Sequence, residues 1–151
     1  MALISDIGES WRRPRVVVRR LLARGRSEPF AFSFLLIFLA LALLAISPGL
    51  ARQADGTPLL PRLYATSLGL LATIPVWYLL AALGHLAARA LGGKGSYYGG
   101  RLALFWSLVA ISPAMLVQGL VGVGLAANLL GLAVGAGFLV FWVLALMEVE
   151  S

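Results

Sequence analysis

Four long apolar segments constrain the fold of this 151-residue chain more than any other feature of its sequence. They cover about residues 30–47, 63–91, 102–120 and 125–147. A helix of about 20 apolar residues crosses the roughly 30 Å hydrocarbon core of a bilayer. In that core only helices and closed barrels satisfy every backbone polar group. We therefore predict an all-α integral membrane protein with four transmembrane helices.

Proline residues are expected to shape three of these helices. Ser47, Pro48 and Gly49 should end the first helix, because proline lacks a backbone N–H and its ring clashes with the preceding turn. Pro75 should kink the second helix, and Pro113 lies inside the third.

The segment before the first apolar run is strongly basic. Residues 1–29 carry seven of the twelve Lys and Arg residues of the chain. Apolar side chains recur there near helical spacing with arginines on the other faces, which predicts an amphipathic helix lying in the headgroup plane. The alternative is that these arginines act only as a topology signal. The segment is too long for the charged region of a cleaved signal peptide. Residues 148–151 form a short acidic tail.

The distribution of positive charge predicts how the chain crosses the membrane. Residues 1–29 and 89–101 carry ten Lys and Arg residues, whereas residues 49–62 carry two and residues 121–124 carry none. Cytoplasmic connections of membrane proteins are enriched in Lys and Arg. We therefore expect both termini and the connection between the second and third spans to be cytoplasmic.

The residue types that catalysis or metal binding requires are scarce. The chain has no cysteine, one histidine and six carboxylates, so it offers no disulfide, no thiolate metal site and no second histidine for a haem or zinc site. Residues 92–96 (GGKGS) resemble a phosphate loop, but Lys94 is followed by glycine where the Walker motif needs serine or threonine. We expect no enzyme activity, no catalytic residue, no cofactor, no metal and no nucleic-acid partner.

The glycine-rich connection between the second and third apolar segments is the main candidate site. His85 lies about 33 Å along a helix from Leu63, at 1.5 Å per residue, which places it at the membrane interface. We predict that this hinge contacts a partner protein or lipid; the alternative is a flexible connector with interfacial anchors. The candidate contact residues are His85, Arg89, Lys94, Tyr97, Tyr98 and Arg101.

Polar and aromatic residues suggest how the last two segments pack. Gln118 and Asn128 lie about equally far from the middle of the turn at residues 122–124, so we predict an interhelical hydrogen-bonded clasp between them. Phe105, Trp106, Phe141 and Trp142 gather near the other ends of these two segments, as an aromatic belt would.

The residues around the hinge resemble a known family. The second apolar segment ends in His85 and Arg89, continues as LGGKGSY at residues 91–97, and precedes Ser112 and Pro113. This pattern is similar to that of the Yip family, polytopic membrane proteins named for their interaction with Ypt/Rab GTPases. The resemblance covers roughly residues 30–147 and implies a polytopic membrane protein.

Two features of the chain depart from the Yip pattern. Family members commonly have five spans, whereas four are counted here, and a short basic N-terminal segment replaces the long acidic one of eukaryotic members. Rab binding is therefore not carried over. The composition is rich in arginine, has one lysine and lacks cysteine, which indicates a bacterial member located in the inner membrane.

Taken as a whole, the sequence favours a non-enzymatic membrane scaffold or an accessory subunit of a larger membrane complex. Its partners would be anionic membrane lipids and another membrane protein. The alternative is a small transporter or channel component, which would need a polar pathway through the spans. Gln118, Asn128 and a few hydroxyl side chains are the only material for one.

Overall fold

The computed structural model describes residues 2–25, 27–52, 58–122 and 124–150, and these form seven helices. Four helical segments are long and apolar enough to cross a membrane: α3, α4 together with α5, α6, and α7. The predicted all-α class with four membrane-spanning segments is confirmed. The helices are α1 (Ala2–Ser10), α2 (Pro14–Leu22), α3 (Glu28–Arg52), α4 (Leu59–Ala72), α5 (Ile74–Ala90), α6 (Tyr97–Val121) and α7 (Leu125–Val149).

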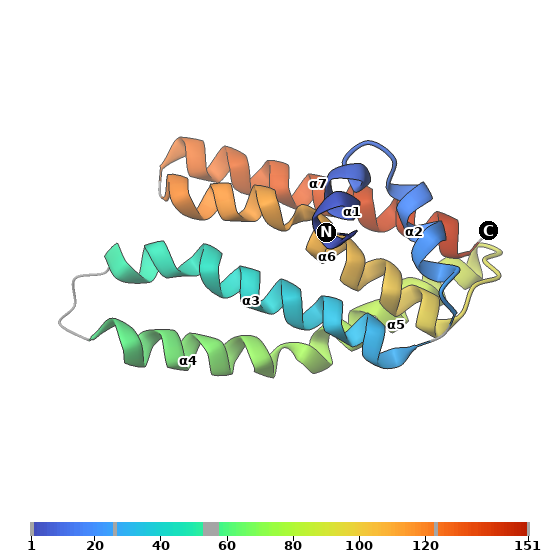
Figure 1. Cartoon of the computed structure of the whole chain (residues 1–151), viewed down its shortest axis with the longest axis horizontal. Helices are drawn as coiled ribbons and strands as arrows, with labels where there is room; N and C mark the ends of the chain where they lie inside the picture. The colour runs from blue at the N-terminus through green and yellow to red at the C-terminus, as the bar shows by residue number, and fades with distance from the viewer. Residues whose placement is uncertain (1, 26, 53–57, 123, 151) are drawn as a thin grey trace.

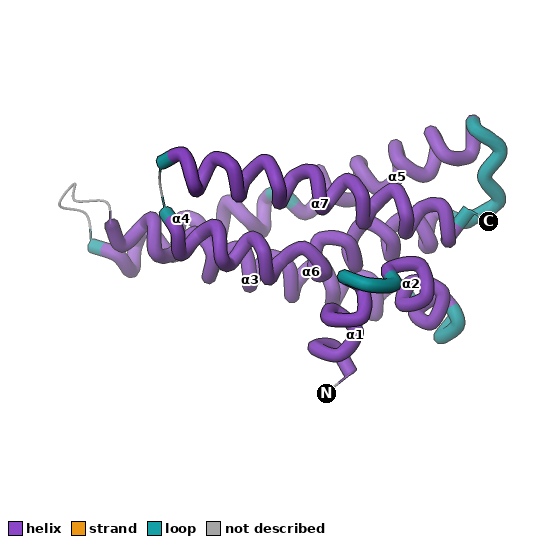
Figure 2. The backbone as a smooth tube through the Cα atoms, turned by 90° about the horizontal axis from the view of Figure 1, so that it is seen from above, coloured by secondary structure: helices purple, strands orange, loops and turns teal. Residues whose placement is uncertain are grey.

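Helix α6 is the centre of the bundle. It packs between α3 and α7, and α4 lies along the outer side of α3 (Figure 1). Seen from above, α5 and the α1–α2 pair lie on opposite sides of α6 and α7 (Figure 2). Phe105 and Trp106 of α6 are buried in the core, where Trp106 meets Phe34 edge-on at 5.0 Å. The prediction that these two aromatics belong to an interfacial belt is therefore wrong.

Serine hydroxyls explain why two prolines do not end their helices. Helix α3 continues through Pro48 to Arg52, past the predicted stop. A proline leaves the carbonyl oxygen four residues earlier without its usual N–H donor. In both helices the hydroxyl of the serine before the proline donates to that carbonyl instead. Ser47 Oγ donates to Leu44 O at 2.8 Å. In α6, where Pro113 is likewise interior, Ser112 Oγ donates to Val109 O at 2.6 Å.

Helices α4 and α5 form one spanning segment that is interrupted at Thr73. The Thr73 hydroxyl donates to Leu70 O at 2.6 Å, and Pro75 lies in the first turn of α5. The predicted kink near Pro75 is therefore present as a break between two helices. None of the residues of α4 is buried. This helix touches the rest of the chain mainly through α3.

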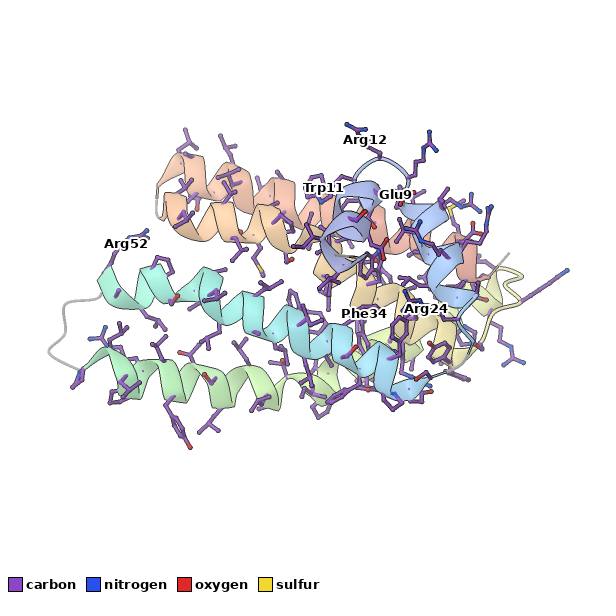
Figure 3. The ribbon with its side chains drawn as sticks, in the orientation of Figure 1. Glu9, Trp11, Arg12, Arg24, Phe34 and Arg52 are labelled. Atoms are coloured by element: carbon purple, nitrogen blue, oxygen red, sulfur yellow. The ribbon has the colours of Figure 1, made fainter. Side chains whose placement is uncertain are left out.

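The basic N-terminal segment packs on the bundle. Val17, Val18 and Leu21 of α2 are buried at 0–2% exposure, and α2 lies against α7. Trp11 Nε1 donates to Ala110 O at 2.9 Å, so the turn after α1 is fixed to the middle of α6 (Figure 3). The apolar face of α2, which we expected to enter the headgroup plane, is instead buried against α6 and α7. Other apolar residues of the segment, Ile4, Trp11 and Val16, are exposed.

The two ends of the bundle differ in their contacts. The residues that join α5 to α6, numbers 91–96, lie together with α2, the start of α3 and the last turn of α7 at what we call the hinge end. At the other end, called the turn end, Arg52 donates to Gly119 O and Leu120 O at 3.4 and 3.2 Å and so caps α6. Residues 53–57 of the predicted 49–62 loop lie outside the described residues.

Candidate functional site

The hinge has a defined backbone conformation that begins α6 earlier than expected. Helix α5 ends at Ala90 and α6 starts at Tyr97, five residues before the predicted third segment. Ser96 is the N-cap of α6, and its Oγ accepts from Gly99 N at 3.1 Å. Gly92 has φ +97°, a conformation that favours glycine. The connecting stretch is therefore only residues 91–96.

Glu150 is seated inside this hinge. Its Oε1 lies 2.5 Å from His85 Nδ1, whose N–H donates to the carboxylate, and its Oε2 accepts from Gly95 N at 2.7 Å. The backbone is joined as well, because Lys94 N donates to Glu150 O at 3.0 Å. His85 is 2% exposed and Glu150 is 9% exposed. A carboxylate far along the chain thus fixes the end of α5 to the loop.

The glycines of the hinge allow this close approach. A Cβ on Gly95 would lie 2.7 Å from Val149 O, and a Cβ on Gly99 would lie 2.5 Å from Val149 Cγ1. Separations below 3.0 Å force the neighbouring atoms to shift. The glycines therefore form a fitted seat for Val149 and Glu150, which we call the glycine cradle. The alternative of a flexible connector does not describe this arrangement.

Five of the six predicted contact residues line one cavity of about 430 Å³ at the hinge. They are His85, Arg89, Lys94, Tyr97 and Tyr98, and the cavity also contains Gly93, Gly95 and Ser96. This cavity is called the hinge cavity below. Arg101 is not among its lining residues, because its guanidinium is bound to Glu28 at the start of α3, with Nε 3.0 Å from Oε2.

The lining residues of the hinge cavity differ in what they can bind. His85 is buried and its Nδ1 is bound to Glu150, and its predicted contact with a partner or lipid stays a prediction. Tyr97 meets the His85 ring edge-on at 4.5 Å. Tyr98 is 5% exposed, and its buried hydroxyl has no hydrogen-bond partner in the described part of the chain.

Arg89 and Lys94 are the cations available at this cavity. Both are exposed, and neither makes a side-chain hydrogen bond or ion pair with any residue that the structure describes. Most other cations described at the hinge end form ion pairs with carboxylates of the same chain. Arg15 and Arg19 bind Glu148 at 3.0 and 2.7 Å.

Further ion pairs within the basic segment hold its arginine side chains against neighbouring carboxylates. Arg20 binds Asp6 and Glu9 at 2.6 and 2.7 Å, which joins α2 to α1. The hydrogen bond to Glu148 raises the pKa of Arg19 above its ordinary value. Arg19 therefore stays charged over the whole pH range in which proteins fold.

The site presents two cationic side chains, and none of the described serine hydroxyls is bonded to His85. A carboxylate on the Nδ1 of a histidine is the arrangement that orients a general base. Ser96 Oγ, which belongs to the serine nearest in sequence, accepts from Gly99 N and makes no bond to His85 among the described residues. Within the same residues, no group of three His, Cys, Asp or Glu side chains could hold a metal ion.

The predicted clasp between Gln118 and Asn128 is not formed among the described residues. Asn128 is exposed, and Gln118 Nε2 lies against Gly131, 2.8 Å from where a Cβ would be. Equal spacing from a turn sets equal depth along two helices, but it does not set the faces on which the side chains lie. The open side of Gly131 provides the room that Gln118 occupies.

The family follows from the comparison with known proteins. The family model described as the Yip1 domain matches residues 8–150, which is nearly the whole chain. The chain belongs to the Yip1 domain family. No curated protein and no solved structure matches this Yip1 domain significantly. Together with the four apolar helices, the match identifies a multi-pass membrane protein of the Yip family.

Sequence reasoning missed one important residue of this Yip1 domain. Glu150 is 65 residues from His85, so no local spacing relates them. A signal was nevertheless present: Glu148 and Glu150 follow a long apolar run, and a carboxylate there needs a donor or a cation. Glu148 forms ion pairs with two arginines of α2, and Glu150 is hydrogen-bonded to His85 and to the hinge backbone.

Proposed function

We propose that this Yip1 domain is a non-enzymatic membrane scaffold or accessory subunit that docks through its hinge end. The observation that carries the proposal is the pair of exposed cations, Arg89 and Lys94, which have no partner among the described residues and lie at a preformed cavity. Elsewhere at this end, Arg15, Arg19 and Arg101 are bound to carboxylates of the same chain. Two free cations beside paired ones provide a surface that an anionic partner can recognise.

The docking partner is anionic membrane lipid or an acidic surface of another membrane protein. Each cation near an anionic leaflet contributes about 1 kcal/mol to association. In this proposal the hinge and both termini face the cytoplasm of a bacterium and the four spans lie in its inner membrane, because positive charge gathers on the cytoplasmic side. A transporter or channel component is less well supported, since Asn128, one of the two candidate pathway residues, is exposed on α7.

Charge reversal tests the docking surface. Replacing Arg89 and Lys94 together by glutamate should weaken copurification of the partner complex in mild detergent, and flotation with anionic vesicles, by about tenfold or more. The loss should be larger at low salt, because exposed charges are screened over about 10 Å at 0.1 M. The matched control reverses Arg12 and Arg13, which are also exposed and lie away from the cavity.

Two results would contradict the proposal. Equal losses in the hinge variant and the control would mean that net charge alone, rather than this surface, drives association. Abolition of function by His85→Ala in a protein that stays folded and associated would indicate an enzyme. For orientation, a reporter active only in the periplasm should work when fused between α3 and α4 and fail when fused after Ser96.

A further inference from the structure

A second, apolar groove adjoins the hinge cavity. It runs between α5 and α7 and has a volume of about 710 Å³. Helix α5 contributes Gly84, Ala87 and Ala88, and α7 contributes Leu139, Trp142 and Leu146. Small residues on one wall and large apolar ones on the other leave a channel open along the helices. We call it the α5–α7 groove.

The groove and the hinge cavity are neighbours that share one lining residue. Gly93 lines both, and Gly92, Arg15 and Glu150 line the groove as well. The volumes, about 430 and 710 Å³, each fall in the range of roughly 300–1,000 Å³ that is usual for small-molecule sites. An occupant of both parts must be polar at one end and apolar along the rest of its length.

The polar part requires an anion that accepts several hydrogen bonds. Arg89 and Lys94 supply positive charge without a partner among the described residues. The buried hydroxyl of Tyr98 has no partner there either, and a buried polar group without a hydrogen bond is costly. A phosphate group fits this donor set, because it is charged and its oxygens accept from both cations and a hydroxyl.

Glu150 does not prevent an anion from binding nearby. Its Oε1 accepts from His85 and its Oε2 from Gly95 N, so its carboxylate is compensated by the cradle itself. Arg15 lines the groove rather than the hinge cavity, and its guanidinium is bound to Glu148. The cations Arg89 and Lys94 are left to set the charge of the hinge cavity.

We propose that this site binds one anionic phospholipid, with its phosphate at Arg89, Lys94 and the Tyr98 hydroxyl and one acyl chain in the α5–α7 groove. The proposal rests on the proposed function in that it uses the same two cations. Lipid tails are as apolar as leucine side chains, so the groove alone cannot select a ligand inside a membrane. Selection comes from the hinge cavity, and the groove fixes the position of the chain attached to the phosphate.

Native mass spectrometry of the detergent-solubilised protein, after exchange with phosphatidylglycerol or phosphatidylcholine, tests the site. One phosphatidylglycerol per chain should be retained and phosphatidylcholine should not. Joint replacement of Arg89 and Lys94 by glutamine, and separately Tyr98→Phe, should each lower retention about tenfold or more, since a lost hydrogen bond to a charged group has effects of this size. Ala87→Trp should fill the groove and lower retention about tenfold.

Matched variants control for charge and for bulk. Replacing Arg12 and Arg13 by glutamine removes the same charge away from the site, and Ala65→Trp adds the same bulk on the exposed face of α4. Both should retain the lipid. Equal retention of the two lipids, or equal loss in Ala65→Trp and Ala87→Trp, would overturn the proposal.

The unsubstituted protein provides a test that does not depend on the folding of variants. Phosphatidylglycerol should raise its unfolding temperature, because a ligand that binds only the folded state stabilises it. Glycerol phosphate, the soluble headgroup analogue, should have no such effect at the same concentration. Equal stabilisation by both compounds would show binding of the headgroup alone and would contradict the role of the groove.

Failure of the proposed lipid site can be distinguished from failure of the proposed docking function. If the Arg89 and Lys94 reversals abolish partner association while Ala87→Trp keeps the retained lipid, the lipid site is wrong and docking stands. If lipid retention follows the predictions while partner and vesicle association do not respond to the reversals, docking is wrong and the lipid site stands.

Discussion

Helix α6 and the α4–α5 segment have almost the same mean hydropathy, 1.8 and 1.7 over their most apolar 18 residues. Their surroundings are nevertheless very different. Half of that stretch is buried within the chain in α6, against 6% in α4–α5. In water, equal hydropathy would favour equal burial. In a bilayer, lipid covers an apolar side chain as well as protein does, so hydropathy does not distinguish a central helix from a peripheral one.

Small and hydrogen-bonding residues account for the difference in burial between α6 and the α4–α5 segment. The buried residues of α6 include Gly99, Gly100, Ala103 and Ser107, which let neighbouring helices approach. The α4–α5 segment has two buried residues among those described, Ala81 and His85, and a Cβ on Gly100 would lie within 3.4 Å of both. The peripheral segment is thus held to the central helix mainly at its hinge end.

The largest effect is expected at the buried attachment of α5. His85→Ala should lower the free energy of unfolding by about 3 kcal/mol, because it leaves the carboxylate of Glu150 buried without its partner. Titration with a denaturing detergent, followed by circular dichroism, measures the change. Adding Glu150→Gln should recover part of the loss, as expected for a coupled pair. Purely additive losses would mean that α5 is held by something other than this pair.

A smaller effect is expected from adding bulk to one glycine on each segment. Gly119→Leu in α6 should cost about 2 kcal/mol by overpacking, since its Cβ would meet the backbone of Ala45 in α3. Gly69→Leu in α4 should change stability by less than about 0.5 kcal/mol, because nothing lies within 4 Å of its Cβ. The same unfolding titration compares them. Equal tolerance of leucine at both positions would remove the distinction between the segments.

The smallest effect is expected from tryptophan hydrogen bonds. Trp106→Phe should cost about 1 kcal/mol, because it removes the bond from Nε1 to Ser10 Oγ, 2.9 Å long and buried. Trp77→Phe in α5 should cost less than this, since its 3.1 Å bond is to Thr73, one turn earlier in the same segment. Protease sensitivity of α1 gives a second measurement: it should rise in the Trp106 variant only.

The sequence was sufficient for the spans and for part of the site. Apolar length predicted four membrane-spanning segments, because the thickness of the bilayer sets that length directly. The charges of the hinge indicated where polar contacts would gather, and five of the six candidate residues line one cavity. Faces and partners were not predictable in this way. They depend on which helix lies beside which, and hydropathy carries no information on that point.

Particular residues show where the inference from sequence stopped. The glycine-rich hinge left a flexible connector as an alternative, yet Gly95 and Gly99 pack closely against Val149, which is distant in sequence. Pro48 suggested a helix end, but the Ser47 hydroxyl donates to Leu44 O and the helix continues. Phe105 and Trp106 suggested an interfacial belt, but they are buried at 0% and 2% exposure. Residues distant in sequence decided the outcome for the glycines and the aromatic residues, whereas a neighbouring hydroxyl decided it at Pro48.

The packing of the basic N-terminal segment against the last helix has a consequence for biosynthesis. Arg15 binds Glu148, which is 133 residues later in the chain. At a translation rate of roughly 5–20 residues per second, on the order of 10 s separates the synthesis of these two residues. Helix α1 can contact α6 as soon as that helix is made, through the bond from Trp106 to Ser10, but the contact of α2 with α7 must wait for the last membrane helix. We therefore expect the pairing of Arg15 with Glu148 to form late in assembly.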